Sequence, residues 1–256
     1  MKHTLLFFTC LFILNADAAF AQNKHFTTSG TIEYERTANM FALVKKKVTK
    51  STPDAKYYYD EYIKREPQFR KLKSILIFGN NTSLFTPVKP EESVWYNYDS
   101  PMANQLNIIY NDFNNGISII QKEFFERTFL VTDSIRKIKW KITDETRVIA
   151  GYTCRRANGL VLDSVYVVAF YTGEIPVSGG PESFAGLPGM ILGVAVPHEN
   201  VTWFATKVTD STIDSKTLTP PKQGKPVNNQ GLYDDIMKVI KSWGDYAIVA
   251  LKGYLL

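Results

Sequence analysis

Cysteine and histidine are scarce in this chain of 256 residues. The only cysteines are Cys10 and Cys154, and Cys10 lies in a leader that we expect to be removed, so the mature protein has no internal disulfide. Beyond the leader the only histidines are His25 and His198, and no CxxC or HExxH pattern is present. A structural zinc site needs about four such ligands. We therefore expect no tightly bound transition metal, and no motif predicts another cofactor.

Several motifs that carry chemistry are also missing. There is no Gly-x-Ser-x-Gly nucleophile elbow, and no glycine-rich phosphate loop with its lysine. The sequence therefore predicts neither a serine hydrolase of that type nor a nucleotide site. The formal net charge is only +5, from 30 basic and 25 acidic residues. Such a balance suits an ordinary solvated surface and does not indicate nucleic-acid binding.

Long apolar runs are confined to the start of the chain. Lys2 precedes an apolar run from Leu5 to Leu14, and Ala19-Phe20-Ala21 stands before Gln22 as an A-x-A-like cleavage site. This is the pattern of a secretory signal peptide over residues 1–21, cleaved near Ala21. No later stretch reaches the about 18 apolar residues that a membrane-spanning helix needs. We expect an exported protein with no membrane span and a single domain over residues 22–256.

Alternating polar and apolar residues dominate the mature chain. Runs of this kind, separated by turn residues about every 8 to 12 positions, are typical of an antiparallel meander. The hairpin signal is clearest at Asn114-Asn115-Gly116, because Asn-Gly favours the tight turn between two strands. The expected strands are 31–37, 41–48, 72–78, 83–87, 107–113, 117–121, 124–131, 137–142, 147–157, 160–171, 190–196 and 201–208.

Two helices are expected beside the strands. Thr52-Pro53 supplies an N-cap and a first helical position, and Pro67 ends the helix predicted over 53–66. After a polar linker at 216–231, apolar residues repeat at helical spacing and predict a C-terminal helix over 232–251. The fold class is therefore mainly β (α+β), a curved antiparallel meander sheet with one inserted helix and a C-terminal helix.

Three aromatic residues gather in the polar loop expected over residues 88–104. They are Trp95, Tyr96 and Tyr98. Such a set either pins the loop to the core as a lid or offers a surface on which a ligand stacks. Cys154 also has two interpretations, because a lone cysteine in a strand pattern is either a small buried hydrophobe or a reactive thiol.

A second loop, over residues 173–185, is rich in proline, glycine and serine. It carries the candidate binding residues Glu174, Ser178 and Glu182. The two glutamates are the best candidates for an acidic pair that faces a ligand or acts in hydrolysis. The alternative is that they are solvated loop acids or caps for backbone N–H groups.

The loop leads into Gly186-Leu187-Pro188-Gly189-Met190-Ile191, which we expect to be structural. Pro188 and Gly189 suit the two central positions of a type II turn, and the apolar residues that follow are typical of a buried strand. Neither the motif nor that strand contains a titratable side chain. We therefore predict a turn and core element around which the chain folds.

Further motifs accompany this element in a fixed order. They are Trp140-Lys-Ile-Thr-Asp-Glu-Thr146, Ile149-Ala-Gly-Tyr-Thr-Cys-Arg-Arg-Ala157, Tyr171-Thr-Gly-Glu-Ile-Pro176, Gly180-Pro181 and Ala205-Thr-Lys207. Together with the central motif they resemble the GLPGLI family of exported Bacteroidota proteins, in which leucine is usual at the position of Met190. The resemblance implies a β-rich envelope protein, often encoded near TonB-dependent outer-membrane receptors. It also implies a distant similarity to the bowl-shaped, non-catalytic N-terminal domain of some bacterial peptide:N-glycosidases, and it supplies no catalytic residues.

Three functions remain open. We favour an exported binding or accessory protein for a small or peptide ligand, with a TonB-dependent outer-membrane receptor as the partner that the resemblance implies. The alternatives are a hydrolase that uses Glu174 and Glu182, and a purely structural envelope protein. Because the helical pattern runs close to Leu256 and leaves no room for a sorting domain, we expect the periplasm rather than the cell surface. The binding interpretation predicts an apolar or aromatic cavity of about 300 Å³ or more.

Overall fold

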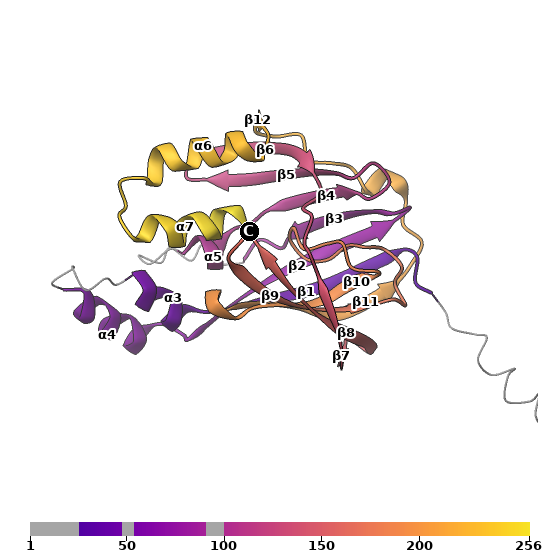
Figure 1. The fold of residues 1–256 in the computed structure, drawn as a ribbon, viewed down its shortest axis with the longest axis horizontal. Helices are drawn as coiled ribbons and strands as arrows, with labels where there is room; N and C mark the ends of the chain where they lie inside the picture. The colour runs from indigo at the N-terminus through magenta and orange to yellow at the C-terminus, as the bar shows by residue number, and fades with distance from the viewer. Residues whose placement is uncertain (1–25, 48–53, 91–99) are drawn as a thin grey trace, which may run out of the picture.

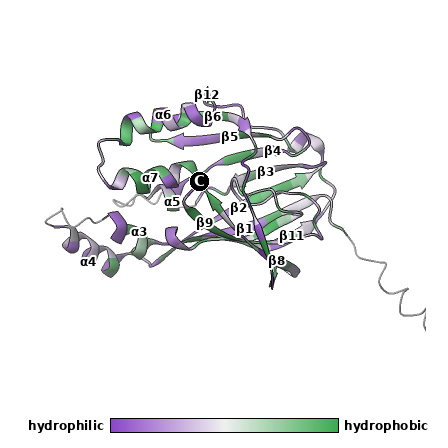
Figure 2. Ribbon diagram, in the orientation of Figure 1, coloured by the Kyte–Doolittle hydropathy of each residue, from purple (hydrophilic) through white to green (hydrophobic). Residues whose placement is uncertain are grey.

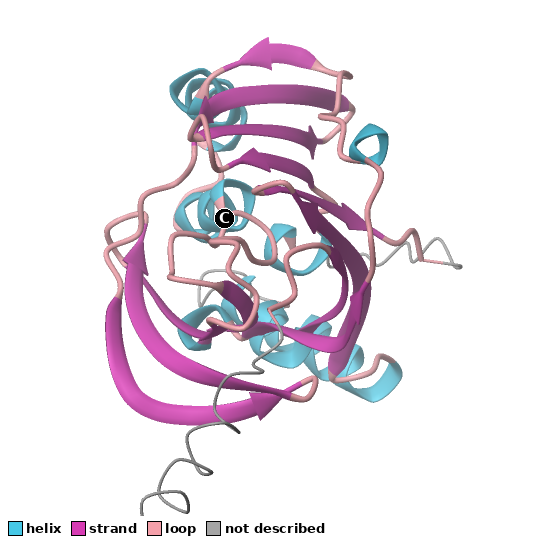
Figure 3. Cartoon of the chain, turned by 90° about the vertical axis from the view of Figure 1, so that its right-hand side faces the viewer, coloured by secondary structure: helices cyan, strands magenta, loops and turns pink. Residues whose placement is uncertain are grey.

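The structure, a computed structural model, describes residues 26–47, 54–90 and 100–256. The expected signal peptide and the aromatic residues Trp95, Tyr96 and Tyr98 lie outside the described residues. Twelve strands form a single mixed sheet (Figure 1), and this sheet curves around a loop and the end of the chain (Figure 3). The mainly β fold class is thereby confirmed.

The elements are as follows. The strands are β1 (Gly30–Asn39), β2 (Phe69–Gly79), β3 (Thr82–Pro87), β4 (Ile108–Asp112), β5 (Ile117–Phe124), β6 (Arg127–Ser134), β7 (Lys141–Ile149), β8 (Tyr152–Val161), β9 (Val165–Thr172), β10 (Met190–Val196), β11 (Val201–Asp210) and β12 (Lys225–Val227). The described α-helices are α3 (Met40–Lys47), α4 (Ala55–Arg65), α5 (Pro101–Asn104), α6 (Asn229–Ile240) and α7 (Tyr246–Leu255).

The sheet consists of two antiparallel runs joined by the first strand. β1 pairs with β2, which begins the run β2 to β6, and with β11, which ends the run β7 to β11. β7 therefore forms one edge of the sheet. β12 forms the other edge and pairs with β6 in parallel. The predicted meander is thus two meanders on either side of β1.

Irregular pairing bends the sheet. The register shifts at Glu33/Tyr34 in β1, at Ile191/Gly193 in β10 and at Ile142/Thr146 in β7. Such bulges increase the local twist and bend the strand that carries them. Gly193 also allows close packing, because a Cβ on it would stand 2.6 Å from the ring of Phe204. The curvature in Figure 3 follows from these positions.

The prediction of a strand over 41–48 is wrong, because Met40–Lys47 forms α3. Its buried side chains are Met40, Leu43 and Val44, which is the i, i+3, i+4 spacing of one helical face. The Asn39 side chain accepts a hydrogen bond from Ala42 N at 3.3 Å, and three lysines in the last turn complement the helix dipole. The other inserted helix is confirmed as α4, which ends shortly before Pro67.

Two strand boundaries also differ from the prediction. The break expected between the predicted strands 137–142 and 147–157 is a bulge within β7, and the chain turns instead at Ala150-Gly151. The strand expected over 160–171 is divided between β8 and β9 by a turn at Leu162-Asp163. All four turn residues have positive φ, between 49° and 87°. Alanine and leucine rarely adopt that region, so Ala150 and Leu162 weaken the turn signal that Gly151 and Asp163 carry.

The C-terminal part contains two helices where one is predicted over 232–251. α6 follows Asn228, whose side chain caps the helix by accepting a hydrogen bond from Gly231 N at 2.8 Å. α7 begins after Gly244, which has φ of 60°. Figure 2 shows mostly hydrophobic residues along α7, which packs against α5 and α6. The linker expected over 216–231 contains the short strand β12.

No helix in the described ranges is long and apolar enough to cross a membrane.

The loop between β9 and β10 is part of the core. Its side chains Ile175, Phe184 and Leu187 are at most 1% exposed. Within it, Gly186 N donates to Ser178 O at 3.0 Å, and Met190 N at its end donates to Ile175 O at 3.0 Å. β9 and β10 beside the loop are buried on both faces. The loop predicted over residues 173–185 is therefore found, and it fills the inside of the curved sheet.

The turn at Pro188 is tighter than the type II turn predicted from the sequence. Gly189 N donates to Leu187 O at 2.8 Å, which closes a three-residue turn. Gly189 has φ of 140°, and a Cβ on it would stand 2.1 Å from Thr172 O. Glycine is therefore required here by the backbone angle and by the close approach of β9.

We expect Gly189→Ala to lower the free energy of unfolding by about 3 kcal/mol or more, because it adds a backbone clash to an unfavourable φ. The matched control is Gly116→Ala, at φ of 67° with no atom within 4 Å of the added Cβ. That change should cost only about 1 kcal/mol of strain. Urea unfolding of both variants measures the difference, and equal losses would contradict the role given to Gly189.

Candidate functional site

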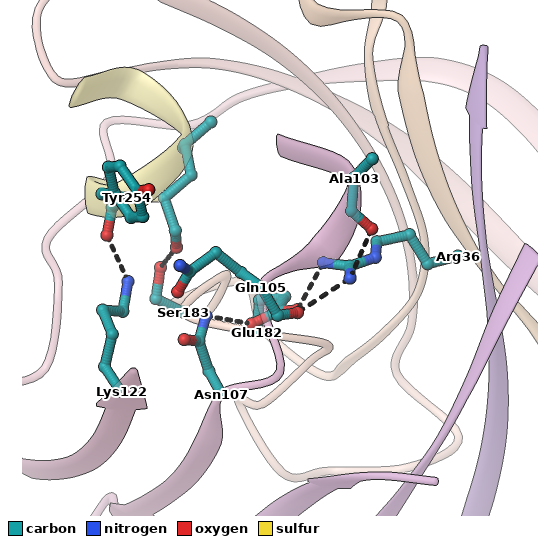
Figure 4. A network of polar contacts seen from close by, with 9 residues as sticks. Arg36, Ala103, Gln105, Asn107, Lys122, Glu182, Ser183 and Tyr254 are labelled. Carbon is teal, nitrogen blue, oxygen red and sulfur yellow. Dashed lines mark hydrogen bonds and ion pairs between the residues drawn. The ribbon is translucent and has the colours of Figure 1, made fainter. Parts of the chain in front are cut away.

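Glu182 in the loop between β9 and β10 points into the interior of the protein (Figure 4). Its Oε1 lies 3.5 Å from Arg36 Nη1 on β1, and Asn107 Nδ2 donates to its Oε2 at 3.0 Å. Glu182 and Arg36 are 4% and 5% exposed. We call Arg36, Asn107 and Glu182 the Glu182 cluster.

Arg36 also binds the segment that includes the end of α5. Its Nη2 donates to Ala103 O and to Gln105 O, each at 2.8 Å. Its guanidinium lies 5.9 Å from the ring centroid of Trp203. Burial lowers the pKa of Arg36, and the negative charge of Glu182 opposes that shift. Through these contacts Arg36 joins β1, α5 and the loop.

Among the residues that the structure describes, the Glu182 cluster is tightly packed. The two spaces beside it measure about 10 Å³ each, which is roughly what one water molecule needs. Glu174 lies elsewhere, with its carbonyl accepting from Thr27 N at 3.0 Å, and in the described part of the chain no hydrogen bond joins it to Glu182. Ser178 contributes its carbonyl to the bond with Gly186. The structure thus does not gather the three loop candidates into one site.

A larger cavity lies where α6 and α7 pack on β4, β5 and β6. Its volume is about 190 Å³. Aliphatic side chains form most of its walls, and Lys122 and Arg136 add positive charge. The aliphatic wall includes Ile109, Ile120, Val131, Leu232 and Leu255. We call this space the α6/α7 cavity, and it is smaller than the about 300 Å³ that the binding interpretation predicts.

The two cations of the α6/α7 cavity are held by the end of α7. Lys122 donates to Tyr254 O (Figure 4), and Arg136 donates to Leu255 O. Contacts of this kind offset the partial negative charge of a helix C-terminus. Neither cation forms an ion pair with a carboxylate among the residues that the structure describes. Arg136 Nη1 is buried and has no hydrogen-bond partner.

Burial lowers the pKa of both cations. The pKa of Lys122 falls to about 8, although the field of Glu182 opposes the fall. The pKa of Arg136 falls to about 10 for the same reason. Loss of solvation therefore disfavours the charged form of both side chains, and a bound anion would favour it.

Other features offer less. A hollow of about 570 Å³ is lined by Lys137, Lys139 and Tyr166, but both lysines are exposed to solvent. Cys154 is buried, and burial together with the charge of Glu174 raises the pKa of its thiol to about 12, so it is a poor nucleophile. In the described ranges, no three His, Cys, Asp or Glu side chains gather closely enough to hold a metal ion.

The sequence analysis missed the cations Arg36, Lys122 and Arg136. Arg36 shares a strand face with Ile32 and Tyr34, so its inward direction follows from the alternation. The predicted strand ends at Gln121, so it does not include Lys122. In the structure β5 continues past Gln121, and its alternation places the Lys122 side chain on the buried face. Arg136 follows β6 and belongs to no periodic pattern, so no signal indicates that it lines a cavity.

A family model matches residues 159–193 of the chain. The family is described as a protein of unknown function (Porph_ging). The matched residues run from the end of β8 through β9 and the loop into β10, so they include Glu182 and the Gly186–Ile191 motif. No curated protein shows significant sequence similarity to the chain.

The fold is similar to part of PNGF-II, for which structures in space groups P21 and C2 match. The TM-score is 0.51 in both cases, at 17% and 16% sequence identity. The match covers 82% and 80% of this chain but only 34% and 32% of the PNGF-II chains. The chain thus spans about a third of the length of PNGF-II, and at this identity the similarity shows the fold alone.

We expect Glu182→Gln to lower the free energy of unfolding by about 3 kcal/mol, because it leaves the buried Arg36 charge unpaired. The control is Asp60→Asn on α4, which breaks an exposed ion pair with Lys56 and should cost less than about 0.5 kcal/mol. Guanidinium unfolding at pH 7 measures both values. A loss for Glu182→Gln no larger than that of the control would show that the buried pair is dispensable.

Proposed function

We propose that the chain is an exported, non-catalytic protein that binds a small ligand in the α6/α7 cavity. The observation that carries the proposal is an aliphatic cavity beside two cations, the buried Lys122 and the half-buried Arg136, neither of which is paired with a carboxylate in the described part of the chain. Apolar pockets with a few convergent polar groups are typical of ligand sites. The volume of about 190 Å³ suits a ligand smaller than most drugs.

We further propose that the chain is a member of the GLPGLI family. The family match over 159–193 contains the Gly186–Ile191 motif, which supports this assignment. The leader pattern supports export to the periplasm or the medium, with cleavage near Ala21. On this assignment the proposed protein partner is a TonB-dependent outer-membrane receptor.

The hydrolase alternative has less support. Among the described residues, Glu182 is bound by Arg36 and Asn107 beside a space of only about 10 Å³, whereas the charge of Glu174 acts on Cys154. A purely structural role is the second candidate. It is favoured by the contacts of Lys122 and Arg136 with the end of α7, because these contacts stabilise the helix without any ligand.

Native mass spectrometry of the protein purified from its own envelope fraction tests the proposal. We expect a chain that begins at Gln22 and releases a small molecule on denaturation. In Ile120→Trp the larger side chain fills the cavity, so the amount of bound molecule should fall at least about tenfold, which is about 1.4 kcal/mol of binding free energy.

The matched control is Ile117→Trp, on the same strand. Ile117 is 42% exposed and does not line the α6/α7 cavity, so the bound molecule should be retained. A wild-type protein that carries one stable protein partner and no small molecule would contradict ligand binding and favour the structural role. A mature chain that begins at Met1 would contradict export by signal cleavage.

A further inference from the structure

We infer that the ligand of the α6/α7 cavity is a small monocarboxylate with an apolar tail of about five or six carbon atoms. The inference rests on the proposed function and names the ligand class. The carboxylate would lie against Lys122 and Arg136, and the tail against the aliphatic wall.

The volume of the cavity limits the size of the ligand. It measures about 190 Å³. In another protein a cavity of about 150 Å³ binds benzene, so the space here holds roughly six to nine non-hydrogen atoms. A nucleotide or a disaccharide is too large, whereas hexanoate or benzoate fits.

The charge of the cavity selects an anion. Lys122 is 4% exposed, and the buried Arg136 Nη1 has no partner. The α7 carbonyls that accept hydrogen bonds from these cations carry only partial negative charge. The nearby Glu182 is already bound by Arg36 and Asn107. A carboxylate would accept charge-assisted hydrogen bonds from both cations.

The walls of the cavity select an apolar tail. Ile120, Val131 and Leu232 present only carbon atoms at their side-chain surfaces. A bare inorganic anion would leave these walls uncovered, whereas each buried CH2 group strengthens binding about fourfold. Affinity should therefore rise from acetate through butyrate to hexanoate, and it should stop rising once the chain is longer than the cavity.

Isothermal titration of the purified full chain tests the inference. We expect hexanoate to bind at least about tenfold more tightly than hexan-1-ol, because only the carboxylate accepts charge-assisted hydrogen bonds. Arg136→Met keeps the apolar stem and removes the donors, so hexanoate affinity should fall at least about tenfold. The control Lys137→Met removes an exposed charge outside the cavity and should leave the affinity unchanged.

Equal affinity of the wild-type protein for hexanoate and hexan-1-ol would overturn the inference, and this comparison does not depend on the folding of any variant. Unchanged hexanoate binding by Arg136→Met would also overturn it, because the cations would then serve only to cap α7. If native mass spectrometry finds a ligand of another class, the inference fails and the binding function stands. If no small molecule is found and neither hexanoate nor hexan-1-ol binds, both fail.

Discussion

Arg36 and Glu182 form an ion pair in the interior, where neither charge has bulk water to solvate it. A buried charge without its partner is strongly destabilising, so each residue requires the other. Arg36 lies on β1, which joins the two halves of the sheet, and Glu182 lies in the loop between β9 and β10. The pair therefore fixes this loop inside the curved sheet. It does so although Glu182 has a positive φ of 50°, an unfavourable backbone conformation for a glutamate.

The filled interior determines where a ligand can bind. The loop contributes Ile175, Phe184 and Leu187 to the core, so the inner side of the central strands is covered. Space remains beside the loop, where α6 and α7 cover β4, β5 and β6 and leave the α6/α7 cavity. Its two cations stabilise the end of α7 and also give the cavity its charge. Helix packing and ligand recognition are therefore proposed to use the same side chains.

Most strands could be predicted from the sequence, because alternation and turn residues act locally. The hairpin at Asn114-Asn115-Gly116 and the buried β10 are both found where expected. α3 was missed although Asn39 and the helical spacing of its apolar residues indicate it. The candidate site was harder to predict. Arg36 and Glu182 are 146 positions apart, and no local pattern shows that an inward arginine meets a loop glutamate.

Hydrogen–deuterium exchange of the loop between β9 and β10 tests most directly whether this loop is core. The relevant amides are those of Gly186, Met190 and Ile191, which donate to main-chain carbonyls inside the sheet. If the loop is part of the core, the free energy of opening measured for these amides should be close to the global free energy of unfolding, as for the amides of β9. Exchange as fast as at the exposed turn Asn114-Asn115 would show that the loop opens independently, and this would contradict the account.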